Sequence, residues 1–189
     1  MSDTRSIIVN HLQSLFKDAN VSVACIYCNY KEQDVHTASN LVASLLRQMV
    51  QNSRAISDNV RSFYKYHQNR DTRPTLDEFT HALQSEIRPY TKIFVVVDAL
   101  DECSEGNDTR ANILKALRSL GRTVNLVVTS RDLPSIASEF QDAKCLSIYA
   151  HNDDMRRYIE GRIARTPRRH LKTLQETIVS KIIENVKGM

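Results

Sequence analysis

The 189-residue sequence contains no tryptophan and only four glycines and four prolines. So little glycine and proline argues against a loop-rich or disordered chain. No stretch approaches the roughly 20 apolar residues that a membrane-spanning helix needs, and the first residues lack the apolar run of a signal peptide. These absences predict a soluble cytoplasmic protein that has no membrane partner.

Cysteine is scarce as well, with four residues: Cys25, Cys28, Cys103 and Cys145. Cys25 and Cys28 form a C-x-x-C within a run that reads as a strand, where residues three apart point to opposite faces. This geometry is poor for a shared metal or a redox pair, and no second C-x-x-C follows. We expect buried free thiols in a reducing compartment.

Charge is nearly balanced, with 26 basic and 22 acidic residues. Part of the basic excess lies near the end of the chain, in Arg156, Arg157, Arg162, Arg165, Arg168, Arg169 and Lys172. Such a cluster could bind nucleic acid or anionic lipid, but no aromatic stacking pattern accompanies it. We interpret it as a solvated helix face and expect no nucleic-acid partner.

Apolar runs and helical periodicity alternate along the chain. Strands are predicted at Val21–Tyr27, Ile93–Val97, Asn125–Thr129 and Lys144–Tyr149, with helices before, between and after them. Thr75 is placed to cap one of these helices. This alternation predicts an α/β fold, with a parallel sheet flanked by helices and a helical C-terminal end.

The most informative segment is Ile93–Val97, five apolar residues followed by Asp98 and then by Asp101 and Glu102. Ligands of open α/β sheets bind beyond the carboxyl ends of the strands. A carboxylate there can hold Mg²⁺, usually through water, while the ion bridges two phosphates. A second acid just beyond can orient an attacking water.

The strand at Asn125–Thr129 ends in the same way, with Thr129, Ser130 and Arg131. In a parallel sheet these residues lie on the same edge as Asp98. The planar guanidinium of Arg131 suits a phosphate, because it donates two parallel hydrogen bonds. The alternative is that Arg131 caps or pairs locally with Asp132.

The segments DALDEC and VNLVVTSRDLPSI resemble the Walker B and sensor regions of NACHT domains, which are P-loop NTPases of the STAND class. The resemblance points to fungal NOD-like proteins and nephrocystin-type N-terminal domains, and it covers about residues 6–189. It implies Asp98 as the metal-side acid, Asp101 and Glu102 as catalytic acids, and Thr129, Ser130 and Arg131 as nucleotide contacts, with Mg²⁺ and ATP or GTP as cofactors. It also implies an incomplete NTPase core over residues 1–150 and the start of a helical subdomain over residues 151–189.

One part of this family pattern does not occur in the sequence: the phosphate-binding loop G-x-x-x-x-G-K-[ST]. The segment SIIVNHLQSLF looks like the helix that follows this loop, so the chain resembles an internal piece that lacks the first, Walker A strand. That strand lies in the family between Asn125–Thr129 and Lys144–Tyr149. We therefore expect these two strands to pair directly, or the sheet to be split.

Two functions remain open. The first is a partial nucleotide-binding module of a signal-transduction NTPase, with weak ATP binding or none and no active hydrolysis in this chain. In that case the module would bind protein partners or self-associate in the full-length protein. The second is a protein-interaction remnant that takes no nucleotide and no cofactor.

Overall fold

The computed structural model describes residues 3–17, 20–53, 56–106, 108–149, 151–166 and 173–186. The chain divides into two compact units, residues 1–141 and residues 142–189, which are described separately. The division into domains after residue 150 stays a prediction.

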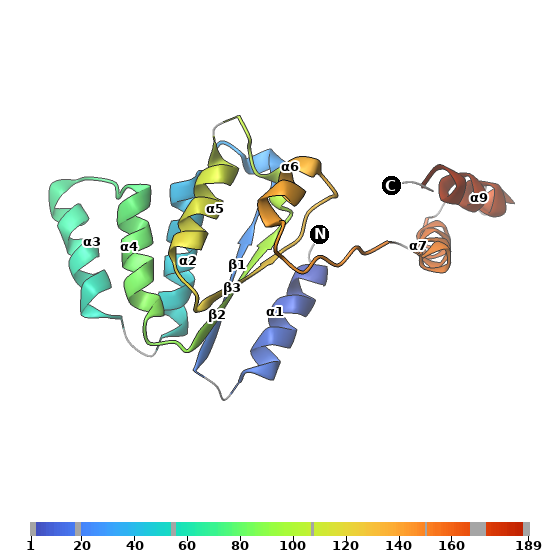
Figure 1. Ribbon diagram of the computed structural model, residues 1–189. Helices are drawn as coiled ribbons and strands as arrows, with labels where there is room; N and C mark the ends of the chain where they lie inside the picture. The colour runs from blue at the N-terminus through green and yellow to red at the C-terminus, as the bar shows by residue number, and fades with distance from the viewer. Residues whose placement is uncertain are drawn as a thin grey trace. The chain divides into compact units, whose positions relative to one another are not determined.

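The first unit is built on a parallel sheet of three strands in the order β1-β2-β3 (Figure 1). These strands are β1 (Val21–Tyr27), β2 (Lys92–Asp98) and β3 (Val124–Val128). Strand β2 is central, and its apolar run is buried on both faces, as the sequence predicts for a parallel sheet. The predicted α/β class is confirmed.

Helices cover both faces of this sheet (Figure 1). Helices α2 and α5 pack on one face, where Ile93, Val95 and Val97 enter the core, and α4 packs against α2. Helix α1 contacts β1 and β2 on the opposite face, and the ring of Phe16 just beyond it stacks on Phe94 with centroids 5.2 Å apart. The helices of this unit are α1 (Asp3–Leu15), α2 (Ala38–Asn52), α3 (Asp58–Arg70), α4 (Leu76–Ile87), α5 (Thr109–Ser119) and α6 (Pro134–Ala137), with 3₁₀ turns η1 (Tyr30–Glu32), η2 (Leu100–Glu102) and η3 (Ser138–Phe140).

The start of α4 confirms the predicted cap. Thr75 accepts a hydrogen bond from the backbone N–H of Glu78, and the Glu78 carboxylate accepts one from the backbone N–H of Thr75. This reciprocal arrangement is a capping box, which satisfies two backbone donors that a helix start leaves unpaired.

The predicted strand at Lys144–Tyr149 is wrong. Residues 144–149 adopt no strand conformation, and Leu146 and Ile148 are 82% and 86% exposed. A strand exists only where its backbone groups pair with a neighbour, and alternating apolar residues alone supply none. Direct pairing with β3, one of the two outcomes expected for these strands, is therefore wrong as well, and β3 is an edge strand among the described residues.

The second unit contains α7 (Asn152–Ala164) and α9 (Gln175–Val186), which pack against each other. Arg156 of the predicted basic cluster forms ion pairs with Glu160 and Glu176. Arg168, Arg169 and Lys172 lie outside the described residues. Within the described part of the chain, no helix has the length and apolar character needed to cross a membrane.

Candidate functional site

The carboxyl ends of the three strands meet at one edge of the sheet, as predicted. In the strand register Tyr27 lies beside Asp98, and Val97 lies beside Val128. The pairing continues past the strands, because the backbone N–H of Cys28 donates to the Asp98 carbonyl at 3.0 Å and that of Thr129 donates to the Val97 carbonyl at 2.9 Å. The predicted site residues that follow β2 and β3 are therefore neighbours in space.

Asp98 and Thr129 are in direct contact at this edge. The Thr129 hydroxyl donates to Oδ1 of Asp98 at 2.5 Å and accepts from the backbone N–H of Ala99 at 3.0 Å. Oδ2 of Asp98 forms no hydrogen bond with any described residue, so the Thr129 hydroxyl holds only one of the two carboxylate oxygens. Ala99 takes the left-handed conformation (φ 55°, ψ 51°), which turns the chain sharply after β2.

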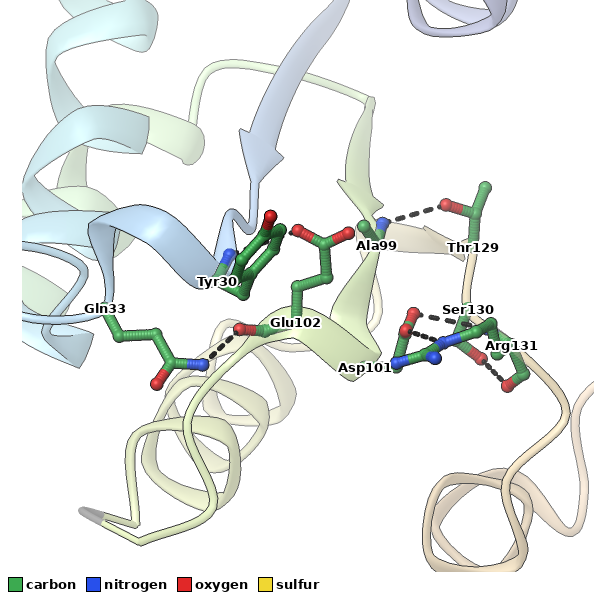
Figure 2. Close-up of polar contacts among 8 residues, drawn as sticks. All are labelled: Tyr30, Gln33, Ala99, Asp101, Glu102, Thr129, Ser130 and Arg131. Carbon is green, nitrogen blue, oxygen red and sulfur yellow. Dashed lines mark hydrogen bonds and ion pairs between the residues drawn. The ribbon is translucent and has the colours of Figure 1, made fainter. Parts of the chain in front are cut away.

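Asp101 and Arg131 form an ion pair across the same edge (Figure 2). Nε of Arg131 donates to Oδ2 of Asp101 at 2.6 Å, and the backbone N–H of Arg131 donates to Oδ1 at 3.2 Å. The Asp101 side chain is 5% exposed, whereas that of Arg131 is 77% exposed. The terminal nitrogens of Arg131 contact no hydrogen-bond acceptor among the described residues. The predicted local partner, Asp132, does not take this role.

Glu102 points the other way, toward the segment that follows β1 (Figure 2). Its carboxylate accepts from the backbone N–H of Tyr30 at 3.1 Å, and its carbonyl accepts from the Gln33 side chain at 3.1 Å. Ser130 turns to its own neighbour and donates to the Arg131 carbonyl at 2.9 Å. Of the predicted residues, Asp98 and Thr129 form one contact, Asp101 and Arg131 form another, and Glu102 and Ser130 join neither.

Two cysteines lie in the segments next to these acids, one after β1 and the other after Glu102. Sγ of Cys28 is 2.7 Å from Sγ of Cys103, and both side chains are buried. The hydrogen bond between the thiols and burial raise the pKa of Cys28 far above its usual range, and the same hydrogen bond lowers the pKa of Cys103. Buried free thiols are thus confirmed for this pair, whereas Cys25 is half-buried and Cys145 is exposed.

The carboxylates at this edge of the sheet fit a magnesium ion that keeps most of its bound water. Within the described residues, no three His, Cys, Asp or Glu side chains gather into a metal cage. Mg²⁺ in nucleotide sites does not need one, because it usually takes one or two carboxylates plus phosphate oxygens and waters. The second carboxylate oxygen of Asp98 could supply one such ligand.

Sequence reasoning missed three contributors to this edge: Tyr30, Gln33 and Ala99. Tyr30 and Gln33 lie on or beside η1, and they reach Glu102 only because β1 and β2 pair in parallel. The left-handed turn at Ala99 could not be recognised from the sequence, because glycine or asparagine usually marks this conformation.

The family model described as Nephrocystin 3, N-terminal, matches residues 4–131, which is more than half of the chain and includes every predicted site residue. No curated protein matches the sequence.

Proposed function

The chain belongs to the nephrocystin 3 N-terminal family, and we propose that it is a partial NACHT-type nucleotide-binding module of a fungal-like signal-transduction NTPase. The observation that carries this proposal is the pairing of Asp98 with Thr129, beside that of Asp101 with Arg131, at the carboxyl edge of a parallel sheet. This edge is where open α/β sheets bind ligands.

In this proposal Asp98 is the Walker B acid. Its second carboxylate oxygen would hold Mg²⁺ through water, and the bound ion would supply charge neutralisation for the phosphates. Thr129 fixes the other oxygen, which keeps the carboxylate in one orientation. Asp101 or Glu102 positions the attacking water in the complete family site.

Arg131 is the sensor of the γ-phosphate in the same proposal, and Ser130 contributes a hydroxyl beside it. Asp101 binds only Nε and the backbone N–H of Arg131. The terminal nitrogens of the guanidinium therefore stay free for a phosphate, which they can contact in a fork geometry. Asp101 would orient the arginine before nucleotide arrives.

The affinity of the chain for Mg·ATP should be low. The sequence holds no G-x-x-x-x-G-K-[ST], so it offers no row of backbone N–H groups and no lysine for the phosphates. A carboxylate-bound ion and one exposed arginine supply only a fraction of such a site. We propose a Kd for Mg·ATP on the order of 1 mM or weaker, which corresponds to about −4 kcal/mol, and no turnover.

A second candidate function is a protein-interaction module that takes no nucleotide and acts by binding protein partners or a second copy of itself. One observation favours it: each of the three acids already has a partner within the chain, namely Thr129, Arg131 and Tyr30. Acids that are satisfied internally can be structural.

Titration calorimetry separates the two functions. The purified chain is titrated with Mg·ATP and Mg·GTP up to about 10 mM, with and without chelator, beside the Asp98→Asn variant. Asp142→Asn is the matched control, because Asp142 is exposed and belongs to the second unit. Weak heat that needs Mg²⁺ and disappears only in Asp98→Asn is the expected result. Heat that is absent, or that persists in Asp98→Asn, overturns the nucleotide proposal and leaves the interaction module.

A further inference from the structure

The buried contact between Cys28 and Cys103 joins two segments that lie 75 residues apart in the sequence. Cys28 follows β1 directly, and its backbone N–H donates to the Asp98 carbonyl. Cys103 ends η2, and its backbone N–H donates to the Leu100 carbonyl at 3.1 Å. The two thiols therefore connect the end of the first strand to the turn that carries Asp101 and Glu102.

The distance between the sulfur atoms is close to that of a covalent bond. The thiols are 2.7 Å apart, and a disulfide bond measures about 2.05 Å. An approach of roughly 0.7 Å thus separates the hydrogen-bonded pair from the bonded one. Both side chains belong to the main core cluster, so neighbouring residues hold the pair together.

Burial decides which oxidant can reach the pair. Cys28 is 6% exposed and Cys103 is 4% exposed, so a bulky disulfide reagent cannot approach either sulfur. Hydrogen peroxide is little larger than water and can enter where local opening admits it. The proximity of the two thiols then favours the reaction between them over further oxidation, because the second thiol is already in place.

We propose that Cys28 and Cys103 form an intramolecular disulfide when the protein meets hydrogen peroxide or another small hydroperoxide. The thiolate of one cysteine attacks a peroxide oxygen and the O–O bond breaks. This step forms a sulfenic acid and hydroxide, and the hydroxide takes up a proton and leaves as water. The second thiol attacks this sulfur, the S–O bond breaks, and a second water leaves. Two thiols are oxidised by two electrons, and one peroxide is reduced to two waters.

The bond would tie η2 to the end of β1. It would close a loop of 75 residues in the unfolded chain, which restricts the unfolded ensemble. The acidic turn that carries Glu102 would lose freedom relative to Tyr30, its hydrogen-bond partner. The proposal does not depend on nucleotide binding, because its chemistry involves only the two thiols and the peroxide.

The test treats the full chain with increasing hydrogen peroxide and then counts free thiols by alkylation after denaturation. Mass spectrometry of the unreduced digest identifies the linked peptides. The measurements use a Cys25→Ser/Cys145→Ser double variant, which keeps the native pair intact and removes the two cysteines that are not fully buried. In this variant we expect both thiols to disappear together, one linked Cys28–Cys103 peptide pair, no covalent dimer, and full return of two thiols with dithiothreitol.

Two further readouts distinguish this bond from nonspecific oxidation. The oxidised double variant should melt about 10 °C higher than the reduced one, and the amide of Tyr30 should exchange more slowly. Single Cys28→Ser and Cys103→Ser variants should each lose the linked peptide while the remaining cysteine overoxidises. Sulfinic or sulfonic acids at both cysteines of the double variant, or disulfides between chains only, would overturn the proposal.

Discussion

The Thr129 hydroxyl donates a hydrogen bond to the Asp98 carboxylate at 2.5 Å and thereby joins the end of β3 to the end of β2. The same oxygen accepts from the backbone N–H of Ala99 at 3.0 Å. One hydroxyl therefore fixes both the acid and the turn that follows it. This contact makes Thr129 a positioning residue for Asp98.

Replacing Thr129 by valine should lower the free energy of unfolding by about 1–3 kcal/mol, because the half-buried Asp98 carboxylate loses a donor and the Ala99 N–H loses an acceptor while the shape is kept. Urea unfolding followed by circular dichroism measures this change. Thr129→Ser is the matched control, since it keeps the hydroxyl and should retain most of the stability. A Thr129→Val variant as stable as the wild type would show that the two hydrogen bonds of the hydroxyl contribute nothing to stability.

Ala99 has a positive φ of 55°, which costs a residue with a side chain roughly 1–2 kcal/mol. Ala99→Gly should therefore raise the free energy of unfolding by about 1 kcal/mol, after the greater freedom of glycine in the unfolded chain is offset. Ala99→Val should lower it, because a β-branched side chain tolerates this conformation poorly. A destabilised Ala99→Gly variant would show that the left-handed turn is not the native conformation.

The ion pair between Asp101 and Arg131 should contribute little to stability, because the Arg131 side chain is 77% exposed and water screens its charge. A double-mutant cycle with Asp101→Asn and Arg131→Ala should give a coupling energy of about 0.5–1 kcal/mol that falls at high salt. Mg·ATP affinity should drop several-fold in both single variants. A large coupling energy with unchanged affinity would make the pair structural.

The capping box predicts a pH dependence at acid pH. The backbone N–H of Thr75, together with its hydroxyl, lowers the pKa of Glu78. A lowered pKa in the folded state means that the contribution of Glu78 is complete above the unfolded value of about 4.3 and is lost as the pH falls through the folded value. The stability difference between wild type and Glu78→Gln should therefore shrink below about pH 4. The exposed Glu184 provides the control variant Glu184→Gln, for which no such trend is expected.

The architecture could be predicted from the sequence where an apolar run or a helix cap is visible in it. The five apolar residues before Asp98 predicted a strand of the parallel sheet, and Thr75 predicted a helix start. Apolar residues alternate in Lys144–Tyr149 as they do in many strands, but this segment forms no strand, because pairing depends on a neighbour that a local pattern cannot reveal.

Only one part of the candidate site could be predicted from the sequence: which strand ends lie next to each other. Parallel strands place Asp98 and Thr129 at one edge, so their proximity followed from the α/β fold. Which acid binds Arg131 depends on the left-handed turn at Ala99, and the meeting of Cys28 with Cys103 depends on strand register. Such long-range contacts leave no trace in local periodicity.

The most direct test of the proposed nucleotide site is to find where a metal–nucleotide complex binds. Mn²⁺·ATP replaces Mg²⁺·ATP in a ¹⁵N-labelled sample, because the paramagnetic ion broadens amide signals near it. The proposal predicts broadening centred on the carboxyl edge of the sheet, at residues 98–102 and 129–131 and at the adjoining amides of Cys28 and Tyr30, and loss of this pattern in Asp98→Asn. Broadening centred elsewhere, or none at millimolar Mn²⁺·ATP, would contradict the assignment of this acidic edge as a nucleotide site.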